Sequence, residues 1–187
     1  PPLNLWFYGV ALLALLGGLG MGEAMALRWL PQHMLGQGRL AHIHLNLLGF
    51  VMLTIIGTMH NLFPTVLNVR LHSPRLAQLT FFILPLGVVS LVTGFLLSHI
   101  PIEIGAGVVL LIGVSLYGYN ILRTWIDAGR PLNAASDHLL IATFFLIVGV
   151  TIGILVAVNS LWDPPAAPFG TLHLVAYTHL ALIGFIT

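Results

Sequence analysis

The sequence predicts an all-α integral membrane protein, a bundle of about six transmembrane helices that forms a single domain over residues 1–187. Three observations lead to this fold class. The chain is 58% hydrophobic and only 6% charged, its mean hydropathy is +1.04, and its apolar residues are gathered in long uninterrupted segments. A soluble domain carries about 25% charged residues, so a chain this poor in charge is expected to present its outer face to lipid.

Six apolar segments are long enough to cross a membrane, since a spanning helix takes about 20 mostly apolar residues. They cover residues 3–30, 39–67, 75–99, 102–126, 135–161 and 168–187. The breaks between them contain helix-breaking prolines, namely Pro31, Pro74, Pro101, Pro131, Pro164, Pro165 and Pro168. Because the connections are short, we expect neighbouring helices to run antiparallel.

Composition also limits the partners of the chain. A net charge of +1 is too small for a nucleic-acid-binding surface, and the absence of Cys excludes disulfides and thiolate metal sites. The sequence begins without Met and finishes inside the apolar run 180–187. We therefore expect it to be part of a longer chain or complex that assembles with other membrane subunits or with itself.

The arginines predict the orientation, because basic residues favour the cytoplasmic side of a membrane. Four arginines lie in or beside the loops after the second and fourth segments, at Arg70, Arg75, Arg123 and Arg130. Two, Arg28 and Arg39, lie on the opposite side. The expected location is the inner (plasma) membrane, with the N-terminus in the cytoplasm.

This topology gathers most ionisable side chains toward the outer, periplasmic side. Such groups are costly within a membrane and need a partner or a function. The histidines and acids on that side are His33, His42, His44, His99, His173, His179, Glu23, Glu103 and Asp163. Four of them, His33, His99, Glu103 and Asp163, are expected at wetted helix ends. Glu23 lies inside the first segment, where it either has no functional role or bonds a histidine ring or lines a polar cavity.

His42 and His44 lie a few residues inside the second segment. Two residues along a helix correspond to about 200° of rotation, so the two rings point to nearly opposite flanks. They are therefore expected to serve two separate sites, or to be two buried histidines with structural roles.

A repeat links the second segment to the sixth. The stretch 44–50 reads HLNLLGF and the stretch 179–185 reads HLALIGF, with His42 corresponding to Tyr177. Sites in membrane proteins tend to form between internal repeats. Because imidazole is a strong ligand for haem iron and for copper, His44 and His179 are candidates for the two axial ligands of one haem. Gly49 and Gly184 would leave space beside the ring.

The stretch 38–64, GRLAHIHLNLLGFVMLTIIGTMHNLFP, resembles subunit I of the haem–copper oxidase superfamily. It is most similar to the cbb-type oxidases and nitric oxide reductases, whose second helix has the form H-x-H-x3-L-G-[FW] followed by G-x2-Y-x-L-x-P. His60 stands in place of the usual aromatic residue. The resemblance implies that His42 binds a high-spin haem and His44 a low-spin haem, within four-helix repeats that carry histidines on helices two, six and ten.

The sixth segment also contains His173 and Tyr177, an H-x3-Y pattern similar to the copper-ligand histidine and tyrosine of A-family oxidases. His173 is therefore an alternative to His179 as a ligand. The chain lacks the adjacent His-His pair that supplies the other copper ligands of the family. The likeness is firm over residues 38–65 alone.

These observations predict a membrane haem protein with one or two b-type haems. It would act in electron transfer or as part of a terminal oxidase or nitric oxide reductase, with a quinone or a cytochrome as its redox partner. His42, His44, His173 and His179 are the candidate ligands for haem iron or copper, supported by Glu23 and Tyr177. A copper-binding membrane protein and a structural or assembly subunit of a respiratory complex remain the alternatives.

Overall fold

The structure is a computed structural model that describes residues 2–131, 134–162 and 171–186, with side chains in the last range described from residue 175 onward. Every secondary-structure element in these ranges is helical. The predicted all-α fold is therefore confirmed.

The first two spans differ in regularity. Helix α1 (Leu3–Ala26) is a plain α-helix. The second span is composite, with a short 3-10 turn η1 (Gln32–Met34), α2 (Leu35–His44), a π-helix η2 (Leu45–Met52) and α3 (Leu53–Val66) following one another without a break. The remaining elements are α4 (Pro74–Leu97), α5 (Ile100–Asp127), α6 (Ala134–Asn159), α7 (Thr171–His179) and a second π-helix, η3 (Leu180–Ile186).

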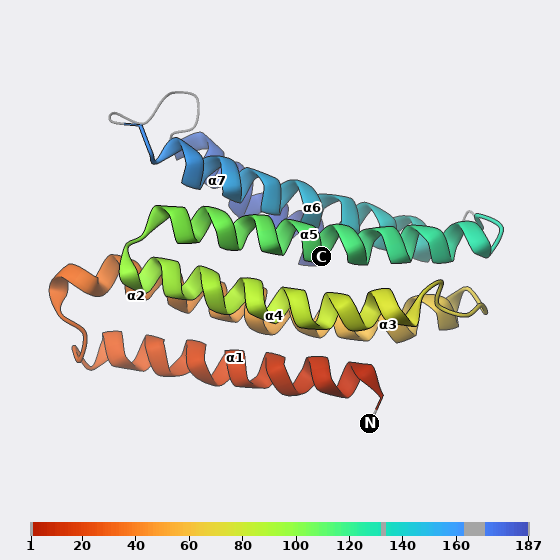
Figure 1. The fold of residues 1–187 in the computed structure, drawn as a ribbon, viewed down its shortest axis with the longest axis horizontal. Coiled ribbons are helices and arrows are strands. Elements are labelled where there is room, and N and C mark those ends of the chain that lie inside the picture. Colours follow the sequence, from red (N-terminus) through yellow and green to blue (C-terminus); the bar gives the residue numbers. More distant parts are fainter. Residues whose placement is uncertain (1, 132–133, 163–170, 187) are drawn as a thin grey trace.

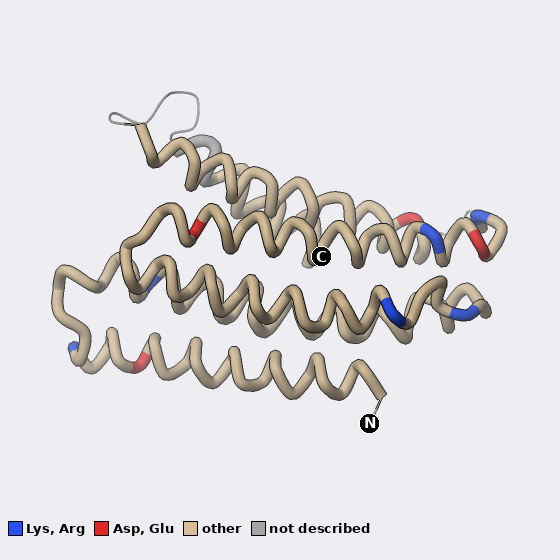
Figure 2. The backbone as a smooth tube through the Cα atoms, viewed as in Figure 1, with Lys and Arg blue, Asp and Glu red and all other residues tan. Residues whose placement is uncertain are grey.

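Successive spans run up and down along the long axis of the molecule (Figure 1). Helices α1, α4 and α6 finish at one end of the bundle, here called the Arg28 end, and α3 and α5 finish at the other, the Arg70 end. The basic residues gather at the Arg70 end, where Arg70, Arg75, Arg123 and Arg130 lie in or next to the connections (Figure 2).

Five helical stretches are long and apolar enough to cross a membrane, at Leu3–Ala26, Gln32–Val66, Pro74–Leu97, Ile100–Asp127 and Ala134–Asn159. They correspond to the first five predicted segments, and the chain is a multi-pass membrane protein. The predicted span 168–187 is described as the shorter pair α7 and η3, because residues 163–170 and 187 lie outside the described part of the chain. Pro164, Pro165, Pro168 and Asp163 fall in that range.

Close packing between spans rests on glycines that receive large side chains. An added Cβ at Gly57 in α3 would lie 2.5 Å from the Cβ of Phe7 in α1. Gly87 in α4 receives Leu110 of α5, and Gly113 in α5 receives Leu84 of α4 in return. Small residues let helix backbones approach closely where the hydrophobic effect does not drive helices together.

A buried polar contact holds the Arg70 end together. The amide of Asn120, in α5, exchanges two hydrogen bonds with the backbone of Ser73, since Oδ1 accepts from Ser73 N–H at 2.9 Å and Nδ2 donates to the Ser73 carbonyl at 3.0 Å. Next to it, the His72 N–H donates to the Thr124 hydroxyl at 3.1 Å. At the surface, Asp127 lies 2.7 Å from His72 Nδ1. These contacts fix the loop before α4 against the last turns of α5.

We expect Asn120→Ala to lower the free energy of unfolding by about 1–3 kcal/mol, because it leaves the partly buried Ser73 N–H without a partner and removes one of the two hydrogen bonds that the Ser73 carbonyl accepts. The measurement is unfolding in mixed micelles followed by far-UV circular dichroism. Asn61→Ala, at an exposed position of α3, is the matched control and should change the free energy little. Equal stability of the two variants would contradict the structural role given to Asn120.

Candidate functional site

His42 and His44 lie on opposite flanks of α2, as their spacing predicts. The ring of His42 packs on α1, where its Nδ1 lies 2.7 Å from the carbonyl oxygen of Gly18. An added Cβ at Gly22 would come within 2.9 Å of the same ring. Asn46 supports this contact by donating from Nδ2 to the His42 carbonyl at 2.7 Å. His42 thus holds α2 against the glycine-rich face of α1.

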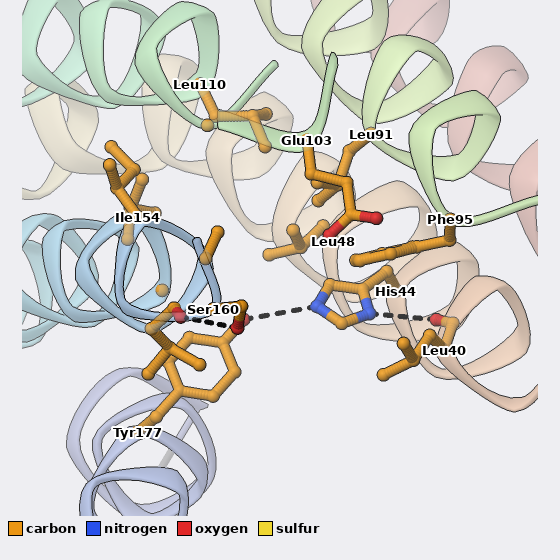
Figure 3. Close-up of a pocket in the computed structure, with 15 residues that line it drawn as sticks. Leu40, His44, Leu48, Leu91, Phe95, Glu103, Leu110, Ile154, Ser160 and Tyr177 are labelled. Carbon is orange, nitrogen blue, oxygen red and sulfur yellow. Dashed lines mark hydrogen bonds between the residues drawn. The ribbon is translucent and has the colours of Figure 1, made fainter. Parts of the chain in front are cut away.

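His44 points the other way, into a cavity among α2, α4, α5, α6 and α7 (Figure 3). Its Nδ1 lies 2.8 Å from the Leu40 carbonyl oxygen and its Nε2 lies 3.4 Å from the hydroxyl of Tyr177. The ring of Phe95 packs on one face of the imidazole, with centroids 4.7 Å apart. The structure therefore brings together His44 and Tyr177, two of the predicted site residues, from helices 133 positions apart in sequence.

The cavity beside His44 has a volume of about 220 Å³ and mostly apolar walls, with Leu48, Leu91 and Leu110 among them. Its ionisable lining groups are His44, Tyr177 and Glu103 of α5. Glu103 was expected at a wetted helix end, but its carboxylate is directed toward the cavity near His44 (Figure 3). Sequence reasoning thus missed Glu103 as a site residue. Gly107 and Leu110, which follow it on the same helix face, were the signal that it faces inward.

His179 is placed elsewhere. Its side chain is exposed and its Nδ1 lies 2.8 Å from the Val175 carbonyl oxygen. It does not line the cavity at His44. Tyr177, two positions earlier, turns toward His44, so about 200° of helical rotation carries His179 to another side of α7. The structure brings His44 together with Tyr177 rather than with His179.

The two copies of the repeat nevertheless share their local structure. In both, the imidazole Nδ1 lies 2.8 Å from the carbonyl four residues earlier, and a π-helix starts at the next residue. In both, the glycine of the π-helix faces the preceding span, since an added Cβ would lie 2.6 Å from Ala14 at Gly49 and 2.7 Å from Phe145 at Gly184. We had expected these glycines to leave room for a porphyrin. They do not, because side chains of α1 and α6 occupy the space beside them.

The hydrogen bonds fix the protonation pattern of three imidazoles. A carbonyl oxygen only accepts, so Nδ1 of His42, His44 and His179 must carry the proton. In the neutral form of each ring, the lone pair then resides on Nε2. Histidines that bind metals usually donate their other N–H to a backbone carbonyl or carboxylate, which orients the ring and raises its basicity.

The remaining predicted residues fall outside this arrangement. Glu23 has an exposed side chain and does not line the cavity at His44. The side chain of His173 lies outside the described residues. His33 and His99 are exposed near helix starts, as predicted for wetted positions. Within the described part of the chain, no group of three or more His, Asp or Glu side chains is arranged to hold a metal ion.

The donors suit haem iron, but the space does not suit one haem shared by His44 and His179. Pockets for ligands of moderate size have volumes of about 300–1,000 Å³, whereas the cavity at His44 has about 220 Å³. A porphyrin bound to His44 would therefore extend beyond the space that the described residues enclose. His179, on another side of α7, would serve a different group.

Comparison of the chain with protein-family models, curated proteins and solved structures finds no match. The resemblance to haem–copper oxidases therefore stays a prediction from the stretch 38–65.

The contact between α1 and the His42 flank can be tested with a pair of glycines from one helix. An added Cβ at Gly18 would lie 2.5 Å from Nδ2 of Asn46, which is held by its bond to the His42 carbonyl, whereas nothing lies within 4 Å of a Cβ at Gly20. We expect Gly18→Ala to lower the free energy of unfolding by about 1–3 kcal/mol through overpacking. Gly20→Ala should raise it by about 0.5–1 kcal/mol, because alanine favours a helix over glycine.

Thermal unfolding of both variants in detergent, followed by tryptophan fluorescence, measures the difference. A Gly18→Ala protein as stable as the Gly20→Ala protein would show that α1 does not pack against Asn46 as described.

Proposed function

We propose that this chain is a haem-binding membrane protein that acts in electron transfer, in which His44 and His179 each supply one axial imidazole to a separate b-type haem. The observation that carries the proposal is the common arrangement in the two repeats. Each places a histidine with its Nδ1 proton bonded to the carbonyl four residues earlier, directly before a π-helix. π-Helical turns inside helices occur frequently at functional sites.

The surroundings of the two imidazoles support separate centres. Nε2 of His44 faces a cavity, while His179 lies on an exposed side of α7 and η3 that carries Val175, Leu182 and Ile183. A histidine on an apolar helix face within a membrane needs a partner. The second ligand and the rest of each haem pocket would come from outside the described residues, either from another part of the protein or from another subunit.

We also propose a location and a redox partner for the protein. The excess of arginine at the Arg70 end favours a cytoplasmic position for that end, in the inner membrane, with the His44 cavity toward the outer side. The redox partner would be a quinone or a cytochrome. Activity as an oxygen or nitric oxide reductase would require a second metal centre, and no arrangement of described side chains favours a copper site.

The test is the haem content of the protein purified from its native membrane together with the subunits that stay bound. A pyridine haemochrome assay and a reduced-minus-oxidised spectrum should show b-type haem with sharp low-spin bands. His44→Ala and His179→Ala should each remove about half of the haem, because each imidazole serves its own iron, and the double variant should bind none.

His33→Ala, an exposed histidine at the Arg28 end, is the matched control and should retain all the haem. A colourless, haem-free wild-type preparation would end the proposal. Loss of all haem from either single variant would instead show that the two histidines share one iron.

A further inference from the structure

A second hollow lies directly outside the cavity at His44. It has a volume of about 550 Å³ and opens at the Arg28 end of the bundle, and we call it the vestibule. Its walls include polar side chains at helix ends, namely Gln37 and Arg39 of α2, Ser98 after α4 and Glu103 of α5. Nε2 of Gln37 donates to the Ser98 hydroxyl at 2.9 Å, while Oε1 of Gln37 is buried without a hydrogen-bond partner in the structure.

Three residues line both the vestibule and the cavity, and they define the junction between the two: Leu40, Phe95 and Glu103. Glu103 is the only ionisable side chain of the three. The polar lining therefore continues from the surface at Arg39, past the carboxylate of Glu103, to the Tyr177 hydroxyl and Nε2 of His44.

Packing places Glu103 at this point. Its backbone and Cγ lie against Gly94 of α4, where an added Cβ would come within 2.8 Å of Cγ, so a larger residue at Gly94 would displace the side chain. Glu103 also lies in the first turn of α5, where the helix dipole favours a negative charge. The carboxylate accepts no hydrogen bond from the described side chains, and its ionisable neighbours are His99, Arg39, His44 and Tyr177.

From this continuity we infer that the vestibule and Glu103 form a proton entry from the Arg28 end of the bundle to the His44–Tyr177 pair. Placing a carboxylate within an apolar helix bundle costs free energy, so such residues are usually functional. Carboxylates and histidines in series are a usual form of proton relay in membranes.

The proposed step moves a proton and changes no oxidation state, so it needs no oxidant or reductant. A hydronium ion in the vestibule gives its proton to a carboxylate oxygen of Glu103. In the haem-free protein, Glu103 then protonates the Tyr177 oxygen through water while the Tyr177 proton passes to Nε2 of His44. Glu103 returns to the carboxylate and Tyr177 to the neutral phenol, so one proton has moved inward.

The first experiment measures water access and needs no haem. Because the chain has no Cys, single cysteines can be labelled without background by a charged thiol reagent in nanodiscs, using the full chain made in a host that cannot synthesise haem. Ala157→Cys in the cavity wall should react, whereas Leu86→Cys on the exposed apolar face of α4 should not.

Adding Glu103→Leu should slow labelling of the cavity cysteine at least tenfold and leave labelling of Ser98→Cys in the vestibule unchanged. An unreactive cavity cysteine would overturn the entry. A reactive one that is indifferent to Glu103→Leu would show that water arrives by another route.

The second experiment follows the proton in the same haem-free protein, because a haem on Nε2 of His44 would occupy the proton acceptor. After a rapid pH jump, the infrared band of imidazole protonation that His44→Gln removes should relax at least tenfold more slowly in Glu103→Gln than in the wild type. Glu23→Gln, an exposed carboxyl at the same end, is the matched control and should relax at the wild-type rate. Unchanged relaxation in Glu103→Gln would refute the relay, and it would leave the proposed haem binding to be judged by the haem content of the native protein.

Discussion

The hydrogen bond from Nδ1 of His44 to the Leu40 carbonyl determines what the second span can do. Within a membrane a histidine cannot bond to bulk water, so each ring nitrogen must find a partner in the protein. The carbonyl of the preceding helical turn provides one partner and sets the tautomer. Nε2 is then the nitrogen directed into the cavity, where Tyr177 meets it at 3.4 Å. The second copy of the repeat makes the same bond at His179 and leaves its Nε2 directed elsewhere.

Glycines and polar side chains together position the helices that carry the site. Glycines in α1, α3, α4 and α5 bring the helices close enough for His42 to reach a carbonyl of α1 and for Glu103 to reach the cavity. Asn120 and Ser73 then fix the opposite end of α4 against α5. The site therefore depends on helix contacts far from it as well as on its own residues.

Composition and the length of the apolar segments were enough to predict the all-α fold and five of its spans, because lipid leaves few other solutions for such a chain. Helical rotation also separated His42 from His44 correctly. The partner of His44 was not predictable, since a likeness between two stretches cannot say which side of α7 faces inward. Glu103 was missed because position near a helix start does not distinguish a wetted side chain from one that Gly94 of the preceding helix admits, and its sequence signal was limited to Gly107 and Leu110 on the same helix face.

The buried contact between Asn120 and Ser73 also has a mechanical consequence. At the Arg28 end, the described polar link between α2 and the α4–α5 turn is the exposed bond from Gln37 to Ser98. Bonds that water can replace resist separation far less than buried pairs do. We therefore expect the helices to separate more readily at the Arg28 end, beside the opening of the vestibule, than at the Arg70 end, which would act as the hinge.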